Sequence, residues 1–342
     1  MSIQSPETIA HAAAADPAHP GAPAAPAARG GRQAARLVRA LARNGKAVAG
    51  LAILIAFIAM ALVAPLVFPD DPSRIGSGGA TPPSAEHWLG TTAKGQDVLA
   101  LTMWGARSSL LVGFVAGILS TIVGIAVGLT SAYVGRRLDD ALSLVTNVFL
   151  LIPGLPLLVL LAAFLPPGLG TVIAVLVITG WAGSARVLRS QALSIRGKDY
   201  IAAAITTGER PLRIVLREML PNMASIVMTT LLGCIIGAIG AQAGLEFLGL
   251  GDANTLSWGT NLFWASSDGA LMIGQWWIFV PSGLAIALVA FALALCNYAV
   301  DEITNPRLRR PRRAVSATAP TAVDRPAAAP AAAAAPAKEE DR

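Results

Sequence analysis

The sequence predicts an all-α, polytopic membrane protein with six transmembrane helices. Of its 342 residues, 54% are hydrophobic and only 13% are charged, whereas a soluble domain carries about 25% charged residues. The apolar residues gather in blocks close to the roughly 20 residues that a helix needs to cross the hydrocarbon core. These blocks contain no Asp, Glu, Lys or Arg and lack the alternation of barrel strands, so backbone hydrogen bonding in lipid requires helices. An ordinary soluble enzyme is excluded.

One transmembrane domain, 36–310, is expected to hold all of the spans between two disordered tails. The tails, 1–35 and 311–342, are rich in Ala and Pro and lack the branched and aromatic residues that bury a core. The first block begins too deep in the chain for a cleavable signal peptide, so it is expected to be retained. The six predicted spans are 47–68, 108–132, 141–165, 167–185, 223–245 and 276–300.

The basic residues predict the orientation of these spans, because cytoplasmic loops carry an excess of Lys and Arg. With both termini inside, 23 of the 26 Lys and Arg residues lie on the cytoplasmic side, and only Arg74, Lys94 and Arg107 lie outside. The net charge of +6 therefore marks a membrane face where anionic lipid head groups sit, and it does not indicate a nucleic-acid partner.

Glycines on two spans predict close helix packing. The second span carries Gly113, Gly117, Gly124 and Gly128, and the fifth carries Gly233, Gly237, Gly240 and Gly244. Small residues four apart let helix backbones approach closely in membranes. Two explanations stay open: packing inside one bundle, or a face that meets a second membrane subunit or lines a path between subunits.

Catalytic and energy-coupling motifs are missing from the sequence. There is no phosphate-binding loop, no His-Glu-x-x-His, and the histidines are scattered. No metal site, catalytic residue or cofactor is expected, and Cys234 and Cys296 are expected to be small apolar side chains without a disulfide. Ion-driven carriers generally keep ionisable groups at membrane depth. Charge-free spans therefore favour an energy source in a partner protein.

The loop 186–222 predicts two short helices. Asp199 is placed as the cap of a helix over 200–207, Gly208 as its left-handed C′ residue, and Pro211 at the start of a second helix that ends near Leu220 and Pro221. Two interpretations are open: a hairpin that only packs under its own bundle, or one that docks into a groove of another protein.

The same loop resembles the EAA loop of binding-protein-dependent ABC importer permeases. The family pattern is Glu-Ala-Ala-x3-Gly-x9-Ile-x-Leu-Pro, and the matching residues include Ala203, Ala204 and Gly208. This chain has Ala202 in place of the Glu and Glu218 in place of the Ile, and it keeps Leu220 and Pro221. The resemblance implies that Ala202, Ala203, Ala204, Gly208, Leu220 and Pro221 couple the chain to an ATPase.

Four further motifs resemble the C-type subunit of the dipeptide, oligopeptide and nickel permease family. They are Gly90-Thr-Thr-Ala-Lys-Gly-Gln-Asp97, Gly105-Ala-Arg-Ser-Ser-Leu110, Phe247-Leu-Gly-Leu-Gly251 with Ser257-Trp-Gly259, and Asp301 to Arg307. The resemblance implies a type I importer fold (MetI-like) in the bacterial inner membrane. It also implies a second permease subunit, two cytoplasmic ATPases and an extracytoplasmic solute-binding protein, with peptides or a related small solute as cargo.

Five outer residues are candidates for a gate or for contact with the binding protein: Gly90, Asp97, Arg107, Glu246 and Trp258. Four of them also have a simpler interpretation. Asp97 fits a helix N-cap and Arg107 fits a side chain reaching the head groups. Glu246 belongs to an outer loop that is acidic overall. Trp258 belongs to a tryptophan cluster that is expected to anchor at the membrane interface.

Two other functions are weighed against the importer subunit. One is a self-sufficient secondary carrier or channel, and the other is a membrane-embedded enzyme. The enzyme is disfavoured because no polar constellation lies at membrane depth.

Overall fold

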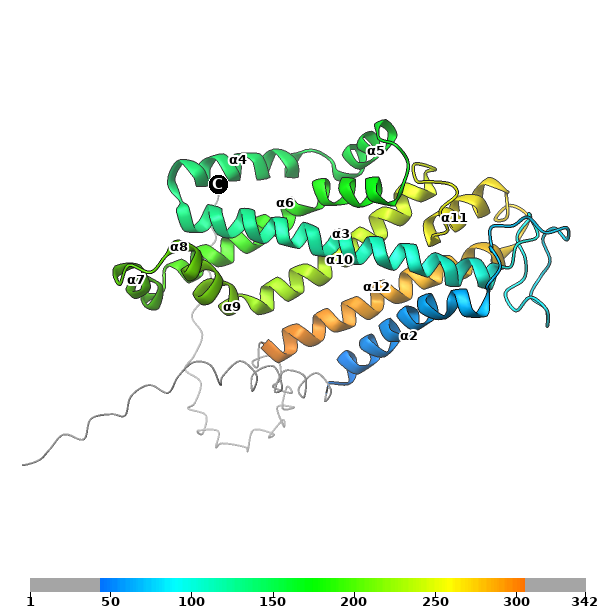
Figure 1. The fold of residues 1–342 in the computed structure, drawn as a ribbon, viewed down its shortest axis with the longest axis horizontal. Coiled ribbons are helices and arrows are strands. Elements are labelled where there is room, and N and C mark those ends of the chain that lie inside the picture. The colour runs from blue at the N-terminus through cyan, green and yellow to red at the C-terminus, as the bar shows by residue number, and fades with distance from the viewer. Residues whose placement is uncertain (1–43, 305–342) are drawn as a thin grey trace, which may run out of the picture. The chain divides into compact units, whose positions relative to one another are not determined.

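The computed structural model describes residues 44–304, and these fold into helices joined by loops (Figure 1). No β-strand occurs within this range beyond an isolated bridge between Thr91 and Asp97. The predicted tails, 1–35 and 311–342, and the Asn305–Arg307 part of the last motif lie outside the described residues. The elements are α2 (Gly45–Val67), α3 (Val98–Val134), α4 (Arg136–Leu151), α5 (Gly154–Phe164), α6 (Leu169–Arg196), α7 (Asp199–Thr206), α8 (Pro211–Arg213), the π-helix η2 (Ile214–Met219), α9 (Leu220–Asn222), α10 (Ala224–Phe247), α11 (Trp258–Ser267) and α12 (Trp276–Thr304).

Five of these helices, α2, α3, α6, α10 and α12, are long and apolar enough to cross a membrane. They confirm the all-α membrane fold class. The block 141–165, predicted as one span, is instead the pair α4 and α5, which meet at 88°. Pro153 explains the break, because it lacks an amide hydrogen and disfavours helical geometry in Ile152 before it. Six spans result only if this bent pair counts as one.

α3 and α6 are longer than the spans predicted at 108–132 and 167–185. α3 begins at Val98 because the Asp97 side chain caps its first turn by accepting from the Ala100 amide at 3.0 Å. α6 continues to Arg196, so basic residues assigned to the following loop belong to a helix. α12 continues as one helix through Pro281.

The glycines of α3 are packed inside this chain. A Cβ built on Gly113 would lie 2.2 Å from a side-chain carbon of Ile239 in α10. A Cβ built on Gly117 would lie 2.6 Å from a side-chain carbon of Ile235 in the same helix. On Gly124 it would lie 2.1 Å from the Ser184 hydroxyl of α6. α3 therefore contacts both α6 and α10 along glycine-lined faces, and Figure 1 shows these three helices side by side. Internal packing is the correct explanation for this span.

The glycines of α10 differ, since none of them has a neighbour from the rest of the described chain. A Cβ on Gly233, Gly237, Gly240 or Gly244 would meet nothing within 4 Å. Because these residues recur at helical spacing, they form one open face of α10, which we call the α10 glycine face. It is not explained by packing within the described residues.

An ion pair near the start of α4 fixes this helix against α3 and α6. Asp139, in the first turn of α4, accepts from Nε and Nη2 of Arg189, each at 2.7 Å. The Ser131 hydroxyl of α3 donates to the same carboxylate. A bidentate arginine–carboxylate pair is among the stronger polar contacts in proteins, so it sets the position of the bent α4–α5 pair.

Candidate functional site

Residues 199–222 form a short helix, a glycine turn and a second helical segment, which we call the hairpin. α7 starts at Asp199, so Asp199 is the first helical residue, and Lys198 occupies the cap without a side-chain hydrogen bond. The prediction that Asp199 caps the helix was one residue off. Helix ends are the least sharply defined part of an element.

Gly208 ends α7 as predicted, with φ at +76°. Its amide donates to the Ile205 carbonyl, and the Glu209 amide donates to the Ala204 carbonyl, both at 3.1 Å. This pair of bonds is the Schellman arrangement, in which a residue with positive φ stops the helix. The turn sends the chain back into α8, where Pro211 occupies the first turn.

The second half of the hairpin departs from the regular helix predicted over 212–220. Residues 214–219 form a π-helix, and the Leu220 amide donates to the Val215 carbonyl, five residues back. Pro221 lacks an amide hydrogen, so the regular ladder is interrupted there. The side-chain amide of Asn222 donates to the Glu218 carbonyl at 2.5 Å and satisfies that backbone group. π-turns of this kind are frequent at functional sites.

The hairpin is anchored by one face and open on the other. Ile201, Ile214 and Met219 are fully buried in a cluster that includes Leu129 of α3 and Leu188 of α6. Ala202, Ala203 and Gly208 are exposed, and Ala204 is half-buried. Leu220 is half-buried and Pro221 is exposed. Large apolar side chains on the open side include Tyr200, Ile205, Leu212 and Leu216.

A shallow hollow beside Gly208 adds positive charge to this open face. It is lined by residues of the turn and of the second helical segment, three of which are Arg210, Arg213 and Arg217. The hairpin thus presents small, apolar and basic groups outward while its other face packs under the bundle. The packed face agrees with the interpretation in which the loop packs under its own bundle. The docking interpretation concerns the open face and stays a prediction.

At the opposite end of the bundle, Gly90, Asp97 and Arg107 lie near the start of α3. Gly90 has a φ of +74°, and a Cβ on it would lie 2.5 Å from the Thr81 carbonyl oxygen. Asp97 is the N-cap of α3, and its second carboxylate oxygen lies 2.7 Å from Nδ1 of His87. The N-cap interpretation is confirmed. Arg107 is exposed, with its guanidinium 5.2 Å from the Trp104 ring centroid.

Trp258 is buried within the protein, so the prediction that its side chain anchors at the membrane interface was wrong. Its side chain is 0% exposed. Its ring nitrogen donates to the Thr102 carbonyl at 3.0 Å, and its backbone amide donates to the Ser109 hydroxyl at 3.1 Å. Gly105 makes room for the ring. Trp276, at 56% exposure, does fit an interfacial position. The buried Trp258 ring offers no surface that a docked protein could contact.

Glu246 is likewise buried, at 3% exposure, so it does not contribute to an acidic outer surface as predicted. One carboxylate oxygen accepts from the Ser257 hydroxyl at 2.5 Å, and the other accepts from the Gln242 side-chain amide at 3.0 Å. Gly251 and Gly259 crowd the side chain so closely that a Cβ on either would overlap it. Glu246 therefore joins the C-terminal end of α10 to the start of α11. Gly251 and Gly259 belong to the Phe-Leu-Gly-Leu-Gly and Ser-Trp-Gly motifs. These motifs were the sequence feature from which the contact could have been predicted.

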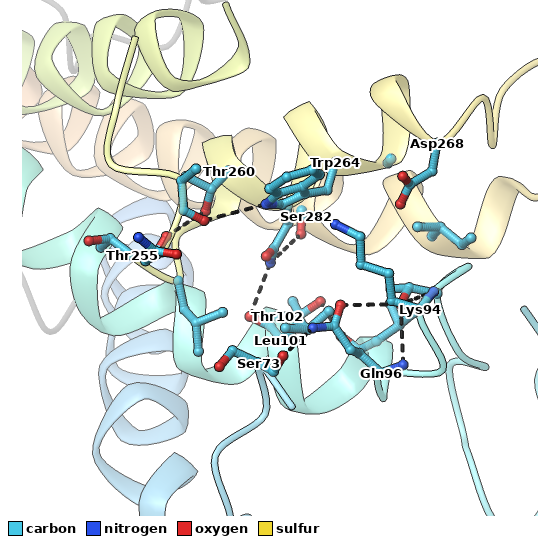
Figure 2. A pocket seen from close by; sticks show the side chains of 18 of the residues that line it. Ser73, Lys94, Gln96, Leu101, Thr102, Thr255, Thr260, Trp264, Asp268 and Ser282 are labelled. Carbon is cyan, nitrogen blue, oxygen red and sulfur yellow. Dashed lines mark hydrogen bonds between the residues drawn. The ribbon is translucent and has the colours of Figure 1, made fainter. Parts of the chain in front are cut away.

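A cavity of about 240 Å³ opens at this end between the 73–102 segment and α11 with its flanking loops (Figure 2). Sequence reasoning did not single out its lining. Ser73, Lys94, Gln96 and Thr102 come from one side, and Thr255, Trp264 and Asp268 come from the other. The Lys94 ammonium lies 3.1 Å from the Trp264 ring centroid. Among residues 44–304, no group of three or more His, Cys, Asp or Glu side chains is arranged to hold a metal ion.

Two family models match the sequence. The model described as the binding-protein-dependent transport system inner membrane component matches residues 120–310. The model described as the N-terminal TM domain of oligopeptide transport permease C matches residues 33–84.

Individual proteins match over most of the chain. The dipeptide transport system permease protein DppC of Bacillus subtilis (strain 168) is 35% identical over 80% of this chain and 85% of its own length. The oligopeptide transport system permease protein OppC of the same organism is 33% identical over 78% of this chain and 87% of its own length. OppC of Mycobacterium tuberculosis is 31% identical over 82% of this chain and 96% of its own length. A chain of the MetNI methionine ABC transporter, solved in inward-facing conformations, aligns with a TM-score of 0.49 at 23% identity, covering 59% of this chain and 94% of that one.

Proposed function

The chain belongs to the family of binding-protein-dependent transport system inner membrane components, and from this premise we propose that it is the membrane-spanning permease subunit of an ATP-driven importer of dipeptides or oligopeptides. The peptide cargo is supported by the names of the DppC and OppC relatives. ATP hydrolysis belongs to two partner ATPases on the cytoplasmic side, and this chain has no ATPase site of its own. An extracytoplasmic binding protein delivers the solute.

The observation that carries this proposal is the half-open hairpin. Its buried face holds it rigidly to α3 and α6 through Ile201 and Ile214, while Ala202 and Ala203 face outward. Small side chains let a helix seat deeply in a partner's groove, and the nearby arginines favour an acidic groove wall. We assign Ala202, Ala203, Ala204, Gly208, Leu220 and Pro221 to ATPase coupling.

The hairpin leads directly into α10, which packs against α3 and α12 but leaves its glycine face open. α9 ends at Asn222 and α10 begins at Ala224, so displacement of the hairpin is passed to α10. We place the second permease subunit against the α10 glycine face, because close helix approach in membranes uses small residues. ATP-driven closure of the ATPases then swings two helix bundles between inward- and outward-open states.

The basic residues support the remaining topology. Both termini and the hairpin are placed in the cytoplasm of a bacterial cell, next to anionic lipid of the inner membrane. α2, whose outward side chains include Leu51, Leu62 and Leu66, faces lipid. Gly90, Asp97 and Arg107 lie on the opposite side, where the binding protein docks. Glu246 and Trp258 act there only through the elements they position.

The test is Ala203→Arg in the assembled complex, with Ala141→Arg as the matched control. Both alanines are exposed, but Ala141 is on α4 and outside the hairpin. We expect Ala203→Arg to leave insertion and assembly intact and to lower ATP-driven peptide uptake by about tenfold or more, as loss of an interface hot spot does. Ala141→Arg should transport normally.

Normal coupling of ATP hydrolysis to uptake in Ala203→Arg would contradict the docking role. Ion-driven uptake by this chain reconstituted alone would overturn the importer assignment in favour of a self-sufficient carrier or channel.

A further inference from the structure

The outer cavity is lined by two opposite charges that do not pair with each other. Lys94 and Asp268 both contribute to its wall, yet neither belongs to an ion pair within 4.0 Å among the described residues. Opposite charges that line one cavity without meeting leave room for a ligand that carries both signs.

Lys94 is held in place by the turn that contains it. The Thr92 amide donates to the Gln96 carbonyl at 2.9 Å, and the Gly95 amide donates to the Thr92 carbonyl at 2.8 Å. The Lys94 carbonyl accepts from the Gly76 amide at 2.9 Å. A further bond, from the Gln96 side-chain amide to the Ser73 carbonyl at 2.7 Å, ties the turn to the preceding loop. The half-buried ammonium is thus preorganised over Trp264.

Asp268 approaches from the facing wall. It is the C-cap of α11, and its amide donates to the Trp264 carbonyl at 2.8 Å. Residues four apart in a helical turn lie on the same side, so the carboxylate and the indole that holds Lys94 share one side of α11. Figure 2 shows Trp264 and Asp268 on the ribbon opposite Lys94 and Gln96.

The cavity suits a small polar ligand. Its volume of about 240 Å³ is below the roughly 300–1,000 Å³ of pockets for drug-sized molecules. Between the two charges the lining combines uncharged polar side chains, among them Gln96 and Asn254, with apolar ones, among them Leu101 and Leu256. The polar groups can bind the amide of a short peptide, the apolar groups can contact its side chains, and the small volume excludes long side chains.

We propose that this cavity is a receiving site for a free dipeptide of small residues, whose carboxylate binds Lys94 and whose ammonium binds Asp268. The inference rests on the proposed function, since it requires that peptides reach this face of the molecule. A lone acidic side chain of the binding protein fits less well, because it would leave the Asp268 carboxylate without a cation.

The test is calorimetric titration of L-alanyl-L-alanine into the permease–ATPase complex in nanodiscs, without binding protein or ATP. We expect saturable binding that Lys94→Gln and Asp268→Asn each weaken by about tenfold or more, because each removes a charge-assisted hydrogen bond. Arg74→Gln is the matched control, since Arg74 is an exposed basic residue one position from Ser73 of the cavity wall but does not line the cavity.

Blocked peptides keep the test valid if a variant fails to fold. On the unmodified complex, the C-terminal amide and the N-acetyl form of the dipeptide should each bind at least about tenfold more weakly, since each lacks one charge. Absence of binding, or equal affinity for all variants and blocked forms, overturns the site. The site is also overturned if the unmodified complex binds no dipeptide and Lys94→Gln loses association with the binding protein. That result would assign Lys94 to an acidic side chain of the binding protein. Uptake of the same dipeptide by the complete transporter tests the proposed function separately.

Discussion

The Glu246 carboxylate accepts a 2.5 Å hydrogen bond from the Ser257 hydroxyl and thereby joins the end of α10 to the first turn of α11. α10 begins directly after the hairpin, and α11 carries Trp264 and leads to Asp268 on the wall of the outer cavity. A continuous route of covalent structure and buried hydrogen bonds therefore runs from the hairpin to the wall of this cavity. Movement of the hairpin can reach that wall through Glu246.

Ser257→Ala should break this link. Ser257 also caps α11 through the Thr260 amide at 3.0 Å, so the variant loses a cap and leaves a buried carboxylate short of one donor. We expect a loss of about 1–3 kcal/mol of stability, measured as thermal unfolding of the purified complex. Ser266→Ala is the control, because Ser266 is exposed on the same helix. Equal unfolding midpoints for both variants would show that the link contributes nothing.

Trp258→Ala should be among the most damaging single changes. The substitution empties a fully buried site between α3 and α11 and leaves the Thr102 carbonyl without its indole donor. Large-to-small changes of buried aromatic residues cost about 3–5 kcal/mol. The half-exposed Trp276 provides the comparison, since Trp276→Ala removes little buried area. Expression level and thermal unfolding measure the contrast, and similar losses for the two would refute the core position of Trp258.

The burial of Trp258 and Glu246 could not be predicted from the sequence. The apolar blocks and the Gly208 turn were predictable because hydropathy and backbone conformation are local properties. The burial of Trp258 depends on Gly105, about 150 residues away in the chain, and no periodicity encodes that contact. Likewise the block 141–165 was predicted as one span, because its hydropathy does not encode the 88° bend between α4 and α5.

The two glycine faces should respond differently to the same substitution. Gly117→Ala puts a Cβ 2.6 Å from Ile235, and such overpacking typically costs about 1–3 kcal/mol. Gly237→Ala meets no neighbour in the described chain, so the chain itself should keep its stability while association with the second permease subunit weakens. Thermal unfolding measures the stability of both variants, and co-purification measures their association with the second permease subunit. Unchanged co-purification of Gly237→Ala would remove the support for a subunit interface on α10.

Gly208→Ala tests the hairpin turn. An alanine held at a φ of +76° adopts a conformation that costs about 1–2 kcal/mol for a residue with a Cβ. We expect faster amide hydrogen exchange over 199–222 and weaker coupling of ATP hydrolysis to uptake. Gly197→Ala is matched to it at the other end of α7, where φ is −76° and no strain arises. If Gly208→Ala exchanges as slowly as Gly197→Ala, the turn is not conformationally demanding.

Arg189→Lys tests how α4 is held to the rest of the bundle. Lys is a point charge and cannot reproduce the two 2.7 Å bonds from Nε and Nη2 to the Asp139 carboxylate. Since the pair is partly exposed, the expected loss is only about 1 kcal/mol, or an unfolding midpoint lower by about 2–4 °C. Arg186→Lys is the control, because Arg186 is exposed and makes a single bond, to the Asn147 side chain. If the two variants unfold at the same temperature, the bent α4–α5 pair must be held by its apolar contacts rather than by the Asp139 carboxylate.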